Sequence, residues 1–182
     1  MIKSKDRSGW IGASDTAMVM GNWNTATFAK WWATKLGLRR DTFTTPAMQA
    51  GTYYEHRILD FLGINRRDRQ IKKRRLRLRV NLDGEDRITI CEIKTHKSEH
   101  FKLSRAYWMQ AQVEMFATGK ELYIVAYRLT DAEYNNYFLP IDKTRLSAHH
   151  VRYDPAWIEK EYLPRLRILA AALRKGVFPQ CA

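Results

Sequence analysis

Cysteine is scarce in this chain of 182 residues, and so are proline and long apolar runs. The two cysteines, Cys91 and Cys181, are too few for a disulfide framework, a four-cysteine zinc site or a protein-held iron–sulfur cluster. Any bound metal must therefore have oxygen or nitrogen ligands. No apolar run approaches the roughly 18 residues that a membrane-spanning helix needs, and no apolar segment follows the charged start MIKSKDRSGW. These absences predict a soluble, cytoplasmic protein that makes no use of a membrane.

Acidic residues are also in the minority, since 19 Asp and Glu face 32 Lys and Arg and give a formal net charge of +13. Apolar residues make up 45% of the chain, or about 82 side chains, which is enough for one well-buried core. The low proline count and the 12% aromatic content are typical of a folded chain rather than a disordered one. We therefore expect a single folded domain over residues 1–182.

The positive charge is concentrated between Arg66 and Arg79, where nine basic residues and one acid give a net charge of +8. Such a run favours binding to a polyphosphate, because Lys and Arg release the counterions that condense on nucleic acid. A solvated face that only keeps the protein soluble is the alternative. The run does not have the pattern of an amphipathic helix, which disfavours binding to a membrane surface.

Capping residues and periodicity predict the secondary structure. Polar caps and terminal glycines predict helices over 14–20, 25–37, 45–63, 98–118 and 154–176, the last with a kink or break at Pro164. Alternation of apolar and polar residues predicts strands over 75–83, 87–95, 121–129 and 134–141, the first two forming a hairpin after a basic loop. The expected fold class is α/β or α+β, with a mixed sheet of four or five strands flanked by helices on both faces.

Three carboxylates and one lysine are predicted to converge on the hairpin. Glu92 and Lys94 are two residues apart in the second strand, so both point to the same side of the sheet. Asp83 lies across the turn, and Glu55 lies on the apolar side of the preceding helix. Carboxylates repel one another unless a cation lies between them, and hard oxygen ligands suit Mg²⁺ or Mn²⁺. This set points to phosphodiester hydrolysis, with Lys94 orienting the attacking water or neutralising charge.

The simpler interpretation of Glu92 and Lys94 is an exposed ion pair on a strand. The order of Glu55, Asp83 and the Glu92–Lys94 pair argues against it, because the whole arrangement resembles the PD-(D/E)xK nuclease superfamily, with Leu82 in place of the first motif's proline. A closer resemblance is to the lambda-exonuclease, or YqaJ-type viral recombinase, family. It is carried, in the family's order, by residues 11–15, 49–55, 83, 92–94, 107–112 and 119.

The resemblance implies a restriction-endonuclease-like fold and a Mg²⁺-dependent exonuclease that degrades one strand of duplex DNA from its 5′ end. In the family such an enzyme is usually a ring-shaped homotrimer that hands the other strand to a single-strand annealing protein. The resemblance further implies a metal site and its surroundings, namely Asp83, Glu92 and the Ile93 carbonyl as ligands, Lys94 as the catalytic lysine, Glu55 as a further acid and Gln110 as a polar active-site residue.

The remaining implied residues bind DNA. The resemblance assigns a 5′ phosphate to Arg7 and Ser14, with Asn81 beside them, and Ser14 is also a fit N-cap for a helix whose first amides would attract an anion. Arg75, Arg77 and Arg79 are predicted to share a strand face with Asp83 and to lead the duplex backbone toward the metal. Two other functions stay open, a nucleic-acid-binding protein that does not cleave and a structure-specific or restriction-like endonuclease.

Overall fold

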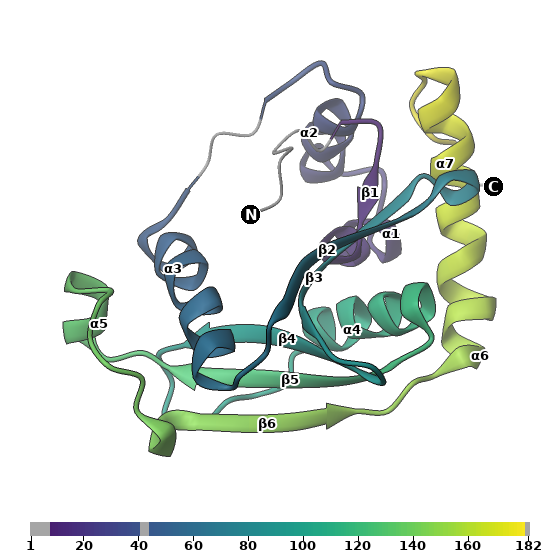
Figure 1. Ribbon diagram of the computed structural model, residues 1–182. Coiled ribbons are helices and arrows are strands. Elements are labelled where there is room, and N and C mark those ends of the chain that lie inside the picture. Colours follow the sequence, from purple (N-terminus) through teal and green to yellow (C-terminus); the bar gives the residue numbers. More distant parts are fainter. Residues whose placement is uncertain (1–7, 41–43, 181–182) are drawn as a thin grey trace.

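The computed structural model describes residues 8–40 and 44–180, which form a mixed sheet flanked by helices (Figure 1). The strands are β1 (Ile11–Gly12), β2 (Arg66–Lys73), β3 (Leu78–Glu85), β4 (Thr89–His96), β5 (Glu121–Arg128) and β6 (Leu146–Val151). The helices are α1 (Thr16–Met20), α2 (Ala26–Lys35), α3 (Pro46–Phe61), α4 (Arg105–Thr118), α5 (Asp131–Asn135), α6 (Pro155–Trp157) and α7 (Leu163–Lys175). None of the helices in these two ranges is both long and apolar enough to cross a membrane. The predicted fold class, a mixed sheet flanked by helices, is confirmed, although the described sheet has six strands where four or five were expected.

The sheet is organised around β3 and β4. Its strand order is β1-β3-β4-β5-β6, and β2 pairs in addition with β3. β4 and β5 are parallel over eight residue pairs, whereas β2 and β4 are antiparallel to β3, and β6 is antiparallel to β5. β2 follows β3 along its whole length, but β1 meets only the first two residues of β3 and β4 only the last two. Because β1 and β4 thus share one edge of β3, that edge is open between them, from Val80 to Asp83.

The two faces of the sheet pack against different helices. Apolar side chains of β4 and β5 that face α4 join one core cluster, and those that face α3 join another. The first set is Ile90, Leu122 and Ile124, and the second is Cys91, Ile93, Val125 and Tyr127. Glu92 belongs by alternation to the α4 face, so a charged side chain is buried beside the larger core cluster.

Two segments differ from the predicted secondary structure. The basic stretch predicted as a loop forms β2, because an outer strand can present charged side chains to solvent and shows no apolar alternation. The strand predicted over 134–141 is wrong. That region contains the end of α5 and an irregular segment, and the last strand of the described chain is β6, at Leu146–Val151.

Helix starts differ at two places. The first helix begins at Thr16, since residues 13–15 form a 3₁₀ turn in which the Asp15 carboxylate accepts a hydrogen bond from the Gly12 amide at 2.7 Å. The helix predicted from Ser98 begins only after Ser104, whose hydroxyl accepts from the Tyr107 amide at 3.2 Å. The structure confirms the predicted caps at Thr25 and Thr45.

The expected break near Pro164 takes the form of a π-helical turn over Ile158–Tyr162, between α6 and α7. Proline has no N–H and its ring clashes with the carbonyl four residues earlier, so a regular α-helix cannot continue through it. α7 then runs to Gly176, which ends it in the left-handed conformation with φ of 68°. Beyond α7, Phe178 packs edge-on against Phe28 of α2 at a ring distance of 5.8 Å.

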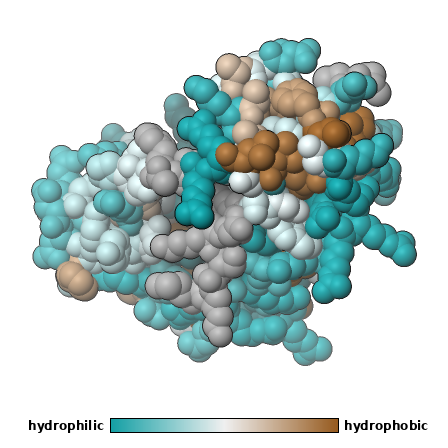
Figure 2. Space-filling view, turned by 90° about the horizontal axis from the view of Figure 1, so that it is seen from above, coloured by the Kyte–Doolittle hydropathy of each residue, from teal (hydrophilic) through white to brown (hydrophobic). Residues whose placement is uncertain are grey.

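The upper face of the molecule combines a hydrophilic surface with one apolar patch. Figure 2 shows brown atoms gathered on the side where α2 and α7 lie, among teal atoms over most of the remainder. The large exposed apolar side chains next to these helices are Leu38, Val177 and Phe178.

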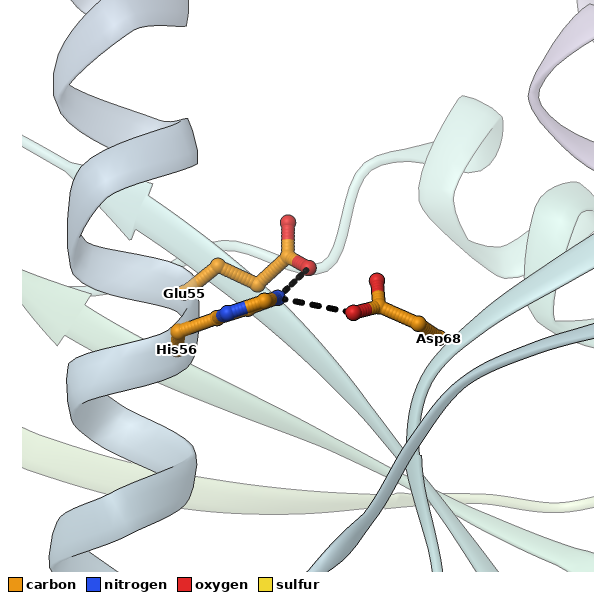
Figure 3. A group of neighbouring side chains, drawn as sticks. All are labelled: Glu55, His56 and Asp68. Carbon is orange, nitrogen blue, oxygen red and sulfur yellow. Dashed lines mark ion pairs between the residues drawn. The ribbon is translucent and has the colours of Figure 1, made fainter. Parts of the chain in front are cut away.

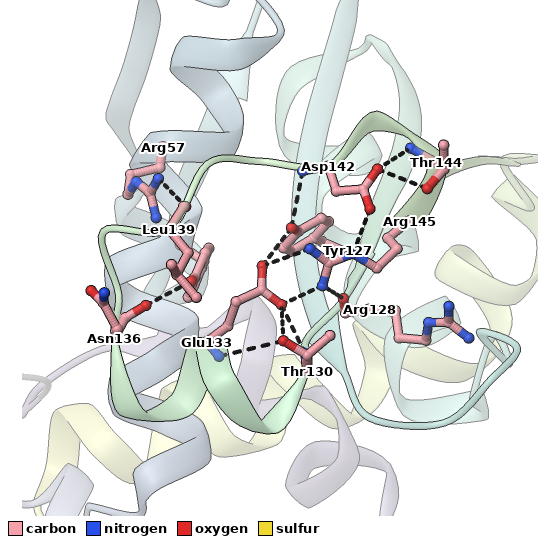
Figure 4. A network of polar contacts seen from close by, with 11 residues as sticks. Arg57, Tyr127, Arg128, Thr130, Glu133, Asn136, Leu139, Asp142, Thr144 and Arg145 are labelled. Carbon is pink, nitrogen blue, oxygen red and sulfur yellow. Dashed lines mark hydrogen bonds and ion pairs between the residues drawn. The ribbon is translucent and has the colours of Figure 1, made fainter.

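A buried polar network attaches the segment from α5 to β6 (Figure 4). The Glu133 carboxylate accepts hydrogen bonds from the Tyr127 hydroxyl at 2.6 Å, from the Thr130 amide at 2.8 Å and from the Arg145 guanidinium. Arg57 of α3 donates to the carbonyl of Leu139 at 2.5 Å. These bonds hold an irregular connection against α3 and β5 without requiring it to form a strand.

Candidate active site

A cleft of about 580 Å³ lies beside the open edge of β3. Residues of α3, β3, β4 and α4 line it, together with the segment from Trp10 to Asp15. Its lining contains six carboxylic acids and three basic side chains, namely Asp15, Glu55, Asp68, Asp83, Glu92 and Glu114 against Lys35, Arg79 and Lys94. A protein with a net charge of +13 therefore gathers a surplus of carboxyl groups at one place.

Asp83 lies where β3 and β4 separate. The ladder between the two strands ends with the pair Gly84 and Cys91. One residue further, the Asp83 carboxylate accepts a hydrogen bond from the Ile93 amide at 2.8 Å. The side chain thus satisfies an amide that the separated strands leave unpaired, and this contact holds Asp83 against the strand that carries Glu92.

Glu92 has one oxygen that is fully hydrogen-bonded and one that is not. Its Oε1 accepts from Lys94 Nζ at 2.6 Å and from Gln110 Nε2 at 2.6 Å. Its Oε2 is buried and has no hydrogen-bond partner in the described part of the chain. A buried acceptor without a donor is unfavourable, so this oxygen fits a bound cation. Asp83, Glu92 and the backbone of Ile93 are together here, and as oxygen donors they suit Mg²⁺ or Mn²⁺.

The carboxylates repel one another, as their pKa shifts show. Burial raises the pKa of Asp83 well above its ordinary value, and the charges of Glu92 and Glu55 raise it further. The pKa of Glu55 is raised by burial and then by Glu92. For Lys94, burial lowers the pKa, but the adjacent Glu92 carboxylate outweighs burial and the net shift is upward. A cation would relieve this repulsion.

Glu114 is a site residue that the sequence analysis missed. It is fully buried on α4, and its Oε1 accepts from Gln110 Nε2 at 2.8 Å. Burial raises its pKa well above the ordinary value, and Glu92 adds to the rise. The spacing of four residues from Gln110 puts both side chains on one face of the helix, so this signal was present in the sequence.

Glu55 belongs to a second group, with His56 and Asp68 (Figure 3). His56 Nε2 lies 3.8 Å from Glu55 Oε1 and 3.3 Å from Asp68 Oδ2. The ligand atoms of the three side chains lie within 4.8 Å of one another, close enough to hold a metal ion. The sequence analysis missed Asp68, since this acid lies within the run that was interpreted as a basic loop.

The predicted DNA-binding residues fall into two groups. Ser14, Arg79 and Asn81 line the cleft. The shared strand face predicted for Arg75 and Arg77 is wrong, because Arg75 lies in a 3₁₀ turn and Arg77, with φ of 49°, is in the left-handed region that interrupts the alternation.

Two further findings concern the predicted phosphate site. Ser14 is not a helix N-cap, since it lies inside the 3₁₀ turn and α1 has only five residues. The helix-terminus argument for a phosphate is therefore wrong, and the role of Ser14 stays a prediction. Arg7 lies outside the described residues.

Basic side chains also approach the cleft around an aromatic ring. The Lys72 ammonium lies 5.3 Å and the Arg77 guanidinium 5.9 Å from the ring centre of Trp10, which lines the cleft. Positive charge thus borders a cleft with an acidic floor. This is the arrangement expected where a polyanion approaches a bound divalent cation.

The fold is similar to that of solved exonucleases. Over nearly its full length the chain has the same fold as an alkaline exonuclease and a phage-related exonuclease. Against an alkaline exonuclease (LHK-Exo) from Laribacter hongkongensis the TM-score is 0.67 at 22% sequence identity, covering 93% of this chain and 90% of that one. Against a phage-related exonuclease from Haemophilus somnus 129PT the TM-score is 0.65 at 14% identity, covering 91% and 95%.

Comparison of the sequence alone identifies no relative. No family model matches the sequence, and no curated protein matches it either. At identities of 22% and 14%, the structural likeness establishes the fold. The function has to be argued from the side chains in the cleft.

Proposed function

We propose that this protein is a Mg²⁺- or Mn²⁺-dependent deoxyribonuclease, a 5′-to-3′ exonuclease that acts on linear duplex DNA in phage-type recombination. The observation that carries the proposal is the buried Oε2 of Glu92 near Asp83, for which residues 8–40 and 44–180 provide no hydrogen-bond donor, in a cleft whose surplus of acids favours a bound cation. The fold shared with exonucleases supports the same reaction class.

In this proposal Asp83, Glu92 and the Ile93 carbonyl hold the metal ion. The ion, when bound, stabilises the negative charge that develops on a phosphate and makes a nearby water more acidic. Lys94 provides a fixed positive charge next to Glu92, where it can neutralise charge or orient the attacking water. Glu55 is a further acid at the cleft wall, and Gln110 holds one oxygen of Glu92 in place.

DNA would enter along the basic border of the cleft. Lys72 and Arg77 flank Trp10, whose ring offers a surface for base stacking, and Arg79 and Asn81 lie deeper. Ser14 also lines the cleft, and in this proposal it contacts a terminal phosphate.

The resemblance extends the proposal beyond the single chain. It includes a ring-shaped homotrimer, a single-strand annealing protein as partner and the cytoplasm as the place of action. None of these is needed for the chemistry of the cleft, so each requires its own test.

The first test compares two forms of one plasmid, linear and covalently closed, each incubated with the protein and Mg²⁺. We expect the linear form to be degraded and the closed form to persist, because an exonuclease needs an end. Glu92→Gln removes a proposed ligand charge and should abolish degradation in the same assay while the protein still binds DNA.

Three outcomes would contradict the proposal. Cutting of the closed plasmid would indicate an endonuclease. Binding without degradation by the unchanged protein would indicate a non-cleaving nucleic-acid-binding protein. Full activity of Glu92→Gln would show that the charge of Glu92 is not needed to hold the metal ion.

A further inference from the structure

Glu114 differs from the other fully buried acids of this protein. Glu85 contacts Lys120 at 2.5 Å and Arg69 at 2.9 Å, and Glu133 is paired with Arg145. Glu114 has no ion pair in the described part of the chain. Its Oε1 accepts from the uncharged amide of Gln110, its carboxyl group also lies next to that of Glu92, and its Oε2 is buried without a donor among the described residues. A buried acid held in this way contributes little to stability by itself, so its position beside the cleft needs another explanation.

The amide of Gln110 can adopt only one orientation between its neighbours. Its Nε2 lies 2.6 Å from Glu92 Oε1 and 2.8 Å from Glu114 Oε1. A carboxylate oxygen accepts hydrogen bonds, and Nε2 carries two hydrogens, so the nitrogen must face both acids. The amide oxygen then faces Lys94 Nζ, 3.4 Å away.

This orientation decides which oxygen of Glu92 is free. Gln110 and Lys94 both donate to Oε1, and no donor among the described residues reaches Oε2. If the Gln110 side-chain amide rotated by half a turn, its oxygen would face the Glu92 carboxylate and would repel it. The second acceptor, on Glu114, prevents that turn.

We propose that Glu114 is a positioning residue for the metal site. By accepting one Gln110 hydrogen, it fixes the amide so that Oε1 of Glu92 is hydrogen-bonded and Oε2 is presented to the metal. This inference rests on the proposed function, since it assigns a role in holding the metal. The feature of Glu114 that orients the Gln110 amide is its acceptor oxygen, not its negative charge.

The test measures Mn²⁺ affinity by titrating the free ion's electron paramagnetic resonance signal, without DNA. Glu114→Met removes the acceptor at similar volume and should weaken Mn²⁺ binding by about 10-fold, as loss of a residue that orients a metal ligand typically does. Glu114→Gln retains a carbonyl acceptor and should bind Mn²⁺ almost as tightly as the unchanged protein. Glu114→Ala, which adds no bulk, provides the same measurement if the methionine variant does not fold.

Two controls separate positioning from simple stability. Gln112→Met alters an equally buried glutamine of α4, which donates to the Arg152 carbonyl at 2.9 Å and accepts from the Asp154 amide at 2.7 Å. It should lower the unfolding temperature and leave Mn²⁺ affinity unchanged. Gln110→Met should weaken Mn²⁺ binding as Glu114→Met does, and the double variant should be no weaker, because both act through one contact.

Each contrary result has a distinct meaning. Unchanged Mn²⁺ affinity in Glu114→Met, or a loss in Glu114→Gln as large as in Glu114→Met, would overturn the positioning role alone. Failure of the unchanged protein to bind Mn²⁺ would overturn both this role and the proposed function.

Discussion

Buried acids in this protein have opposite pKa shifts, according to their partners. Asp83 and Glu114 are close to other carboxylates, and burial followed by the charge of Glu92 raises their pKa values. For Glu133, burial also raises the pKa, but hydrogen bonds from Arg145, Tyr127 and Thr130 outweigh burial and bring it from 4.5 to about 2. Asp83 and Glu114 belong to a group of carboxylates whose mutual repulsion a cation would reduce, whereas the charge of Glu133 stabilises the fold.

Glu133→Gln should lower stability in a pH-dependent way. Because the pKa of Glu133 is lower in the folded state, its charge stabilises the fold fully above about pH 4.5, and this contribution is lost as the pH falls toward 2. The shift corresponds to about 3 kcal/mol at pH 7. Urea unfolding of the two proteins across pH 2–7 should therefore show a difference of this size at neutral pH that shrinks in acid.

Asp131→Asn is the matched control for this prediction. Asp131 is on the same short helix, but its side chain is 92% exposed and its partner Lys97 is exposed as well. Its substitution should change stability by no more than about 0.5 kcal/mol. A pH-independent loss in Glu133→Gln would show that the volume of the network, and not its charge, matters.

At the scale of elements, β2 has two different basic ends. Near its start, Arg66 and Arg69 approach the buried Glu85 at 3.6 and 2.9 Å, so their charges are used within the fold. Near its end, Lys72 lies over Trp10, which Arg77 also approaches. We therefore propose that, if the basic run binds DNA, the part next to Trp10 faces it, because the charges of Arg66 and Arg69 are paired with Glu85.

The variant Lys72→Gln/Arg77→Asn should weaken DNA binding about equally for all sequences. Asn is chosen at position 77 because it tolerates the left-handed conformation. If each residue contacts one phosphate, the slope of log K against log salt should fall by about 1.8. Binding titrations at several salt concentrations measure this slope.

Arg66→Gln/Arg69→Gln provides a control with the same loss of charge, at two positions on the strand that carries Lys72. It should leave the slope nearly unchanged, because these two arginines pair with Glu85. Equal slopes for the two double variants would show that only net charge attracts DNA.

At the scale of the whole molecule, the proposed metal site would link metal binding to the stability of the fold. A ligand that binds only the folded state stabilises it, by about 2.7 kcal/mol when its concentration is 100 times the Kd. Mn²⁺ should therefore raise the unfolding temperature of the unchanged protein, as scanning calorimetry with and without a chelator would show. Asp83→Asn should lose this rise.

The unfolding temperatures measured with a chelator, in the absence of metal, provide a second test. Without metal, Asp83→Asn should be at least as stable as the unchanged protein, because one of the repelling carboxylates is gone. A full Mn²⁺-induced rise in Asp83→Asn would place the ion elsewhere, and the cluster of Glu55, His56 and Asp68 would then be the first alternative to examine.

The sequence by itself determined the features that depend on local spacing. The period of two in a strand places Glu92 and Lys94 on one side of the sheet, and in the structure they are in contact at 2.6 Å. Glycine at the helix ends adopts φ near +70° at Gly119 and Gly176, where other residues would be strained. These properties follow from a few neighbouring residues.

Tertiary structure decided what depends on contacts between distant segments. β2 is a strand because β3 lies beside it, although its basic sequence shows no apolar alternation. The separation of β3 from β4 places the Asp83 carboxylate on the Ile93 amide, and the packing of α4 against this face places Gln110 and Glu114 behind Glu92. A sequence pattern reports which side chains share a face, whereas the distance between two faces is set only when the elements pack.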